Sequence, residues 1–348
     1  MSNKKQYTKS ITPIDDYVCT LPEETRKIAE DELRETESVR RHALESLREW
    51  AEKNPRIKAI RLDSKFLLKF LRCKKFSLPM VKEQIERYLV LRHYVYDDMK
   101  VFTNFDYKMP VMQELIDLGY IFPLPQRDHL NRRVIMYRPG VFNPSKHHNF
   151  EMVKLHGLTY ETLMEDELVQ VHGLVHIVDS SGMGLHYLTI FTPHEVYRIG
   201  RNLEKIVPIR HKQIHGLKVH PSLKFAVDFA LSQMNDKMRK RVFLYKNIED
   251  INVDKTLLPL EYGGTIPMKD MIESFKQELA ARYQTVIGND KMDVNLEMYP
   301  EQVRSGSVRS LKMSIDEIEA EKNYNNNNNI NGYGLQGVQG SFRKLEID

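Results

Sequence analysis

The sequence predicts an α/β protein with a helical bundle at its amino end and a mostly parallel sheet after it. Two patterns indicate this class. Up to about residue 105, apolar side chains recur at helical spacing within charged segments, and from about Pro110 strand-like and helix-like segments alternate. The 348 residues, 41% of them hydrophobic, are enough for one sizeable core and a smaller accessory one.

Three segments form the expected amino-terminal bundle. Thr20 to Glu52 is dense in Glu and Arg and carries loosely helical apolar spacing, which predicts one or two solvent-rich helices. Asp63 is expected to cap a compact apolar helix that follows it. Ser77 precedes Pro79 and is expected to begin another helix that runs to about Tyr96.

Short segments rich in β-branched or aromatic residues then alternate with helical patterns. The expected strands are Arg133 to Tyr137, Leu174 to Asp179, Gln213 to Val219 and Val242 to Tyr245, and the expected helices are Pro110 to Leu118, Phe150 to Asp166, Pro193 to Val207, Ser222 to Lys240 and Met268 to Tyr283. Strand, helix and strand repeated in this way predict parallel strands joined by crossover helices.

These patterns divide the chain into four parts. We expect a flexible arm over residues 1–19, a helical subdomain over 20–105, an α/β domain over 106–285 and a mostly disordered tail over 286–348. The tail contains five consecutive asparagines and spaced glycines, a composition that buries too little apolar surface to offset the cost of ordering.

Composition excludes several classes of protein. Apolar runs such as Gly173 to Val178 are too short to span a bilayer, so any membrane contact is expected to be peripheral. Two cysteines, Cys19 and Cys73, cannot form a disulfide framework, which favours a cytoplasmic location. We expect no metal site: His211, His215 and His220 lack partners at zinc-ligand spacing, and His211 and His215 would lie about 13 Å apart on one face of a strand.

The segment from Pro221 to Arg241 predicts a helix that is apolar around most of its circumference. Its polar residues Lys224, Asp228 and Ser232 form one thin stripe, and four cations, Lys237, Arg239, Lys240 and Arg241, follow it. Apolar surface beside clustered cations suits contact with an anionic membrane. A buried core helix with a charged, solvated end is the alternative reading of this segment alone.

Charge is unevenly distributed along the chain. The whole chain carries 52 basic and 48 acidic residues, a net charge of +4. Lys205 to Lys246 carries 10 basic and 2 acidic residues, or +8, so the remainder carries −4. This positive region predicts a polyanionic partner, and a phospholipid surface is favoured over nucleic acid because no nucleic-acid-binding motif accompanies the charge.

One segment suggests an enzyme only weakly. Asp179-Ser180-Ser181-Gly182 follows an expected strand at the edge where α/β sheets place ligands, but it lacks the spacing of a hydrolase elbow or a phosphate loop. A tight turn through small residues is the favoured interpretation. We therefore expect no catalytic residues, and a hydrolase that uses Ser180 or Ser181 is the weakest of the alternatives.

Several segments together resemble the CRAL-TRIO (Sec14-like) family, and most closely its tocopherol-transfer and retinaldehyde-binding branch. The resemblance rests on Phe66 to Phe76, the strand ending in Asp179, the helix after His220-Pro221 and, above all, Leu258-Pro259-Leu260-Glu261-Tyr262-Gly263-Gly264. It covers about Leu62 to Tyr283. It implies a helical subdomain followed by a lipid-binding domain whose apolar cavity is closed by a mobile gate helix.

The resemblance also implies site residues. The gate would be the helix from Ser222 to Met234, with Leu223, Phe225, Val227, Phe229 and Leu231 on it. A basic cleft for phosphoinositide head groups would comprise Lys74, Arg210, Lys212, Lys237 and Arg241, with Lys74 in place of the family's usual arginine. The expected cavity residues are Tyr137, His156, Thr159, Tyr160, Leu163, Val175, Ile177, Ile190 and Phe191.

These observations predict an intracellular carrier that is not an enzyme and needs no cofactor. It would bind a small lipophilic ligand, such as a retinoid, a tocopherol-like molecule or another lipid, and exchange it at phosphoinositide-containing membranes. His156, Thr159 and Tyr160 replace the small hydroxyl residues of the tocopherol branch, so tocopherol specificity is not expected to carry over. The alternative is a phosphoinositide-binding adaptor whose cavity transfers nothing.

Overall fold

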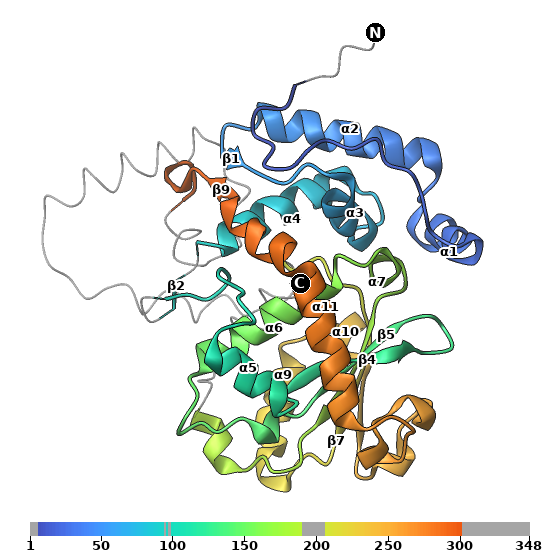
Figure 1. Cartoon of the computed structure of the whole chain (residues 1–348), viewed down its shortest axis with the longest axis vertical. Helices are drawn as coiled ribbons and strands as arrows, with labels where there is room; N and C mark the ends of the chain where they lie inside the picture. Colours follow the sequence, from blue (N-terminus) through green and yellow to red (C-terminus); the bar gives the residue numbers. More distant parts are fainter. Residues whose placement is uncertain (1–5, 94, 97–98, 190–205, 301–348) are drawn as a thin grey trace, which may run out of the picture.

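A computed structural model describes residues 6–93, 95–96, 99–189 and 206–300. Helices α1 to α4 gather at one end of the molecule, above a domain built on a five-stranded sheet (Figure 1). Residues 190–205, which contain the expected start of the Pro193 to Val207 helix, and residues 301–348 lie outside the described part. The predicted α/β class with an amino-terminal helical region is confirmed.

The amino-terminal layer contains four helices: α1 (Glu23–Leu33), α2 (Glu37–Lys53), α3 (Ser64–Cys73) and α4 (Leu78–Leu91). Asp63 caps α3 as predicted, because its carboxylate accepts a hydrogen bond from the Phe66 N–H at 3.1 Å. Helix α4 ends five residues before the predicted end at Tyr96, and the two-residue strands β2 (Val95–Tyr96) and β3 (Met99–Lys100) follow it.

The central sheet has the strand order β4-β5-β6-β7-β8. The strands are β4 (Ile121–Arg127), β5 (Arg133–Tyr137), β6 (Leu174–Asp179), β7 (His211–Leu217) and β8 (Val242–Tyr245). The last four run parallel, whereas β4 pairs antiparallel with β5 at the edge. The sequence did not predict β4 because it contains Pro123 and Pro125, and proline is tolerated in a sheet mainly at such an edge.

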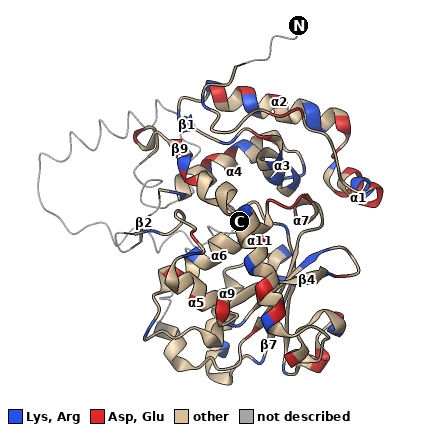
Figure 2. Cartoon of the chain, in the orientation of Figure 1, with Lys and Arg blue, Asp and Glu red and all other residues tan. Residues whose placement is uncertain are grey.

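Helices α5 (Pro110–Asp117), α6 (Asn149–Leu163), α7 (Glu167–His172) and α11 (Met268–Gly288) complete the main core. Helix α11 contacts both α6 and β4 and crosses the molecule towards the amino-terminal layer (Figure 1). Charged side chains are dense on α1 and α2, whereas the region of α5 and α6 is mostly uncharged (Figure 2). This uncharged region is where the hollows described below are found.

The expected continuous helix from Ser222 to Lys240 is divided. A 3-10 turn (Pro221–Leu223) leads into α9 (Lys224–Ser232), and a separate short helix, α10 (Asp236–Arg239), follows. The division has a local cause, because the Asn235 side chain accepts a hydrogen bond from the Met238 N–H at 2.9 Å and so caps a new helix. The apolar segment is therefore a separate two-turn unit.

Both ends of the described chain differ from the expectation. Within the expected arm, the Ile11 N–H donates to the Ile60 carbonyl at 3.0 Å, and Ile11 packs against the amino-terminal core. Within the expected tail, strand β9 (Asp293–Val294) pairs with β1 (Ile57–Ala59), and Tyr299 is fully buried. Apolar residues of both segments cover the helical layer, so residues 6–19 and 286–300 are part of the fold.

Candidate functional site

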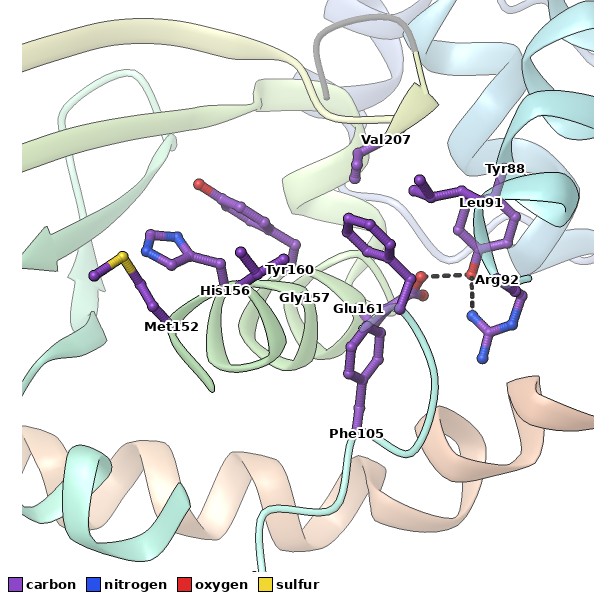
Figure 3. Close-up of a pocket in the computed structure, with 12 residues that line it drawn as sticks. Tyr88, Leu91, Arg92, Phe105, Met152, His156, Gly157, Tyr160, Glu161 and Val207 are labelled. Carbon is purple, nitrogen blue, oxygen red and sulfur yellow. Dashed lines mark hydrogen bonds between the residues drawn. The ribbon is translucent and has the colours of Figure 1, made fainter. Parts of the chain in front are cut away.

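Two adjoining hollows lie beside α6. The first, here called the helix-side hollow, has a volume of ≈ 360 Å³ and lies between α4, α6 and the segment that follows β3. Figure 3 shows its residues around α6. Its apolar lining consists of Leu91, Phe102, Phe105, Met152, Val153, Gly157 and Val207. This lining suits a hydrocarbon chain or ring system.

The second hollow, here called the sheet-side hollow, has a volume of ≈ 310 Å³ and lies between α6 and strands β5 to β7. It shares His156 and Tyr160 with the helix-side hollow, so the two adjoin at these side chains. Its lining is Tyr120, Tyr137, Pro139, His156, Tyr160, His176, Val178, His211 and Ile214. Three tyrosines and three histidines thus gather on one side of α6.

These rings are joined by hydrogen bonds. The Tyr120 hydroxyl lies 3.0 Å from His156 Nε2, and the Tyr137 hydroxyl contacts the Tyr160 hydroxyl and lies 3.1 Å from His176 Nδ1. His176 Nε2 in turn lies 2.8 Å from His211 Nδ1. Polar groups inside an apolar domain are therefore satisfied by one another.

Burial determines the charge of these groups. Loss of solvent lowers the pKa of His156 and of His211 to about 4, and that of His176 well below its ordinary value. The same cause raises the pKa of Tyr160 to about 12 and that of Tyr137 well above its ordinary value. The sheet-side hollow is therefore polar but uncharged at neutral pH.

A break in strand register places His211 in this hollow. His211 pairs with Leu174, but Gln213 pairs with the next residue, Val175, so β7 contains one extra residue at this point. His211 and Ile214 consequently line the same hollow. The expectation that His211 and His215 share a face is wrong, because the extra residue turns His215 to the other side, where it stacks on Phe243.

The structure divides the predicted cavity residues. Tyr137, His156 and Tyr160 line the hollows. Val175 and Ile177 do not, because side chains alternate along β6 and it is His176 and Val178 that face this hollow. Ile190 and Phe191 lie outside the described residues.

Two further predicted cavity residues also lie away from the hollows. The Thr159 hydroxyl donates to the Leu155 carbonyl of its own helix at 2.8 Å, and Leu163 is fully buried in the core. Tyr120, His176 and His211 also line the hollow, and the sequence did not predict them. Alternation along β6 places His176 and Val178 on one face but does not show which face meets the hollow, and the extra residue in β7 leaves no sequence signal.

Charged groups at the far end of the helix-side hollow are paired. The Glu161 carboxylate accepts hydrogen bonds from Lys69 at 3.3 Å and from the Tyr88 hydroxyl, and Arg92 pairs with Asp290. The Lys69 ammonium also lies over the Phe66 ring, 4.5 Å from its centroid. These pairs join α3, α4, α6 and the end of α11, so this end of the hollow is fixed.

Three of the predicted cleft residues lie together at the start of β7. Arg210 and Lys212 both bind the Glu32 carboxylate of α1, at 3.0 and 3.2 Å, and Arg241 donates to the His211 carbonyl. The positive charges of Arg210 and Arg241 help to lower the pKa of Lys212, although loss of solvent is the larger cause. We call Arg210, Lys212 and Arg241 the basic cluster.

The other two predicted cleft residues are placed differently. Lys74 follows α3, and its neighbour Cys73 places its sulfur 3.7 Å from the Ile209 carbonyl, so Lys74 lies near the basic cluster. Lys237 is exposed on α10, and among the described residues no interaction joins it to Arg210 or Lys212. Lys237 precedes Arg241 of the basic cluster by four residues in the chain.

Helix α9 is exposed. None of its nine residues is buried, and Phe225 is 83% exposed. Phe229, Val227 and Leu231 are half-buried, and Leu223 just before the helix is buried. The alternative of a buried core helix does not describe this segment. Leu185 and Leu188, in the segment that contacts the turn before α9, are also exposed.

The turn after β6 is held by the Leu258-to-Gly264 segment. The Asp179 carboxylate accepts hydrogen bonds from the Ser181 N–H at 3.0 Å, from the Ser181 hydroxyl at 2.6 Å and from the Tyr262 hydroxyl. Gly263 has a φ of +87°, and a Cβ atom on Gly264 would lie 1.6 Å from the Leu258 carbonyl oxygen. The Ser180-Ser181 segment therefore forms a structural turn.

Across residues 6–300, the gaps aside, no three His, Cys, Asp or Glu side chains are arranged to hold a metal ion. In the same part of the chain, none of the helices combines the length and the apolar character needed to cross a bilayer.

The helical layer, the mostly parallel sheet and the hollow beside it define a Sec14-like α/β protein. The crystal structure of Sfh5 has the same fold, with a TM-score of 0.50 and 12% identity over 73% of this chain and 99% of that chain. Residues 118–264 match the CRAL/TRIO domain. This domain match confirms the resemblance to the CRAL-TRIO family that the sequence motifs indicated.

Curated relatives agree with this assignment. An alpha-tocopherol transfer protein-like protein from Homo sapiens is 29% identical over 252 residues, which are 72% of each chain. Clavesin-1 from Rattus norvegicus is 26% identical over 278 residues, which are 79% of this chain and 75% of that protein. Both matches extend well beyond the CRAL/TRIO domain.

Proposed function

We propose that this protein is a carrier that holds one small lipophilic molecule in the two hollows beside α6 and exchanges it at anionic membranes. The observation that carries the proposal is the apolar lining of the helix-side hollow, which continues at His156 and Tyr160 into the sheet-side hollow. Together the two hollows fall within the size range of small-molecule sites. A relative named for tocopherol transfer supports the same class of function.

Helix α9 is the proposed gate. Its exposed Phe225 would enter the acyl region of a membrane, and burying a side chain of this size is worth about 1.5 to 3 kcal/mol. In water, an open gate leaves this apolar surface wet, whereas a membrane covers it. Membrane contact therefore lowers the cost of opening, and release of the ligand is coupled to docking.

The basic cluster, together with Lys74 and Lys237, is the proposed contact for phosphoinositide head groups. Each cation near an anionic surface contributes about 1 kcal/mol, so these five side chains would hold the protein at the surface transiently. Peripheral contact of this kind fits a cytoplasmic carrier. The hydrogen bonds between Ser181 and Asp179 give this turn a structural role, which favours a carrier over a hydrolase.

Native mass spectrometry of the full chain, before and after solvent extraction, tests the proposal. We expect one apolar molecule per chain, lost on extraction and regained when the extract is added back. A chain that carries no apolar ligand and takes up none would instead fit a phosphoinositide-dependent adaptor.

The membrane contact has a separate test. Arg210→Ala combined with Arg241→Ala should weaken binding to phosphoinositide-containing vesicles roughly tenfold or more, because two cations are lost. Lys255→Ala with Lys269→Ala removes two exposed charges elsewhere and serves as the matched control. Equal vesicle binding by the two double variants would refute the assignment of the basic cluster.

Phe229→Asp tests the gate from its half-buried side. A carboxylate at this position should impair ligand retention, measured as faster loss of a bound fluorescent polyene. Retention equal to that of the parent protein would remove Phe229 from the gate.

A further inference from the structure

Four side chains in the sheet-side hollow form a single hydrogen-bonded row, here called the Tyr–His relay. The Tyr160 hydroxyl of α6 contacts the Tyr137 hydroxyl of β5, which lies 3.1 Å from His176 Nδ1 of β6. His176 Nε2 lies 2.8 Å from His211 Nδ1 of β7. Tyr160 is the member that lines both hollows. In Figure 3 it lies with His156 on the side of α6 away from Arg92.

Every member of the relay is able both to donate and to accept a hydrogen bond. A tyrosine hydroxyl does both, and a neutral imidazole donates from one nitrogen and accepts at the other. All the hydrogens can therefore point one way along the row or all the other way. A change of direction needs only rotation of the two hydroxyls and the opposite tautomer of the two histidines.

The two directions leave different groups at the ligand end. When His211 donates to His176, His176 donates to Tyr137 and Tyr137 donates to Tyr160, the Tyr160 hydrogen is free to be donated to a carbonyl oxygen. When Tyr160 donates to Tyr137 and the order is reversed, the Tyr160 oxygen accepts from an alcohol. Both directions keep the same number of hydrogen bonds within the relay.

The charged side chains around the hollows are already paired, which favours an uncharged ligand. Of the side chains that line them, Arg92 is already paired with Asp290 and Glu161 with Lys69. An anionic head group would therefore lie beside the Glu161 carboxylate or the uncharged relay. Among these lining residues, no unpaired cation is available to neutralise it. Placing an unpaired charge in such a site is costly.

We propose that the Tyr–His relay is a reversible recognition element, which lets this cavity bind an uncharged lipid whose head group is either a hydroxyl or a carbonyl. The inference rests on the proposed carrier function, since it assigns the polar end of the same cavity. It identifies Tyr160 as the side chain that contacts the head group, and Tyr137, His176 and His211 as the side chains that set its direction.

Displacement of a fluorescent hydrocarbon, diphenylhexatriene, tests the proposal with the full chain after solvent extraction. The competitors are a matched series: heptadecane, 1-hexadecanol, 2-heptadecanone and palmitate. We expect the alcohol and the ketone to bind about two- to tenfold more tightly than the alkane, as one net hydrogen bond allows. We expect palmitate to bind roughly tenfold or more weakly than the alcohol.

Tyr160→Phe removes the ligand-facing hydroxyl and little else. In this variant the alcohol and the ketone should lose their advantage over heptadecane, each affinity being compared with that of heptadecane for the same variant. Tyr107→Phe is the matched control, because Tyr107 packs against Tyr283 away from both hollows and should leave the ranking unchanged.

The outcomes separate the two proposals. Failure of the extracted protein to bind diphenylhexatriene would overturn the carrier and the relay together. Hydrocarbon binding with no preference for the alcohol or the ketone, or a preference that survives Tyr160→Phe, would overturn the relay alone. Palmitate binding as tightly as the alcohol would overturn the preference for an uncharged head group.

Discussion

Helices α3 and α9 are of similar length and both are rich in apolar residues, but the fold treats them in opposite ways. Eight of the ten residues of α3 are buried, whereas none of the nine residues of α9 is. Composition alone therefore does not distinguish a buried helix from an exposed one. The two helices differ in the ion pairs and hydrogen bonds that their charged side chains form.

Helix α3 is joined to its neighbours by buried charges. Arg72 donates to Glu35 at 2.8 Å, to Glu167 at 2.9 Å and to Gln170 at 2.8 Å, and so joins α3 to α7 and to the segment between α1 and α2. In α9, Lys224 pairs with Asp228 of the same helix, and both side chains are largely exposed. The α3 side of the molecule is thus an anchor, whereas the ion pair of α9 lies within the helix and does not join it to the rest of the fold.

The largest expected effect is loss of the anchor. Arg72→Ala leaves the Glu35 and Glu167 carboxylates without their buried partner, which should lower the free energy of unfolding by about 3 to 5 kcal/mol. Urea denaturation measures the change. Lys27→Ala, at an exposed position of α1, should stay within about 0.5 kcal/mol of the parent protein. A loss below about 1 kcal/mol for Arg72→Ala would contradict the anchor.

Low pH should destabilise the fold through two buried histidines. The folded pKa values of His156 and His211 are about 4, below the ordinary value of 6.5, so the unfolded chain takes up protons first as the pH falls. The contribution of the two neutral histidines to the free energy of unfolding is complete above about pH 6.5 and is lost towards pH 4. It is on the order of 2 to 3 kcal/mol for each group.

Unfolding free energies measured between pH 7 and 4 test this expectation. His211→Gln should flatten the dependence, whereas His42→Gln, at an exposed position of α2, should not. Parallel curves for the parent protein and His211→Gln would show that His211 is not held neutral by the fold.

On the exposed side, Phe225→Asp should change function rather than stability. The side chain is already 83% exposed, so the free energy of unfolding should move by less than about 0.5 kcal/mol. Loss of its insertion should slow transfer of a fluorescent lipophile between vesicles by about tenfold. Val18→Asp, 77% exposed but far along the chain, is the matched control, and equal slowing by both variants would remove α9 from the mechanism.

The smallest expected effect concerns the contact between helix α1 and the basic cluster. Glu32 of α1 occupies Arg210 and Lys212, and these bonds hold its pKa below the ordinary value, although burial opposes the shift. Glu32→Ala frees both cations and should tighten binding to anionic vesicles about two- to fivefold. Unchanged or weaker binding would show that Glu32 does not compete with the membrane. Glu30→Ala on the same helix is the control.

Much of this architecture could be predicted from the sequence because it is encoded locally. Asp63 caps α3 through its own carboxylate, and the β-branched run from Leu174 to Asp179 forms a buried strand. The apolar segment after Pro221 was also visible in the sequence. Where it ends was not, because a single residue, Asn235, caps a second helix and divides the segment.

The site was less predictable because it depends on tertiary register. Choosing Val175 and Ile177 over His176 and Val178 is an error of one residue, which moves a set of side chains to the other face of a strand. His211 enters the hollow only through the extra residue in β7. Neither effect is visible in spacing along one segment, since both depend on how neighbouring strands pair.

Release of a preloaded hydrocarbon tests the central claim most directly. The full chain, loaded with diphenylhexatriene, is mixed with vesicles of phosphatidylcholine alone or of phosphatidylcholine with phosphatidylserine, and release is followed by energy transfer to an acceptor in the vesicles. We predict slow release to the neutral vesicles and fast release to the anionic ones, with the difference abolished in Phe225→Asp. Equal rates of release to both kinds of vesicle would contradict a gate that opens on anionic membranes.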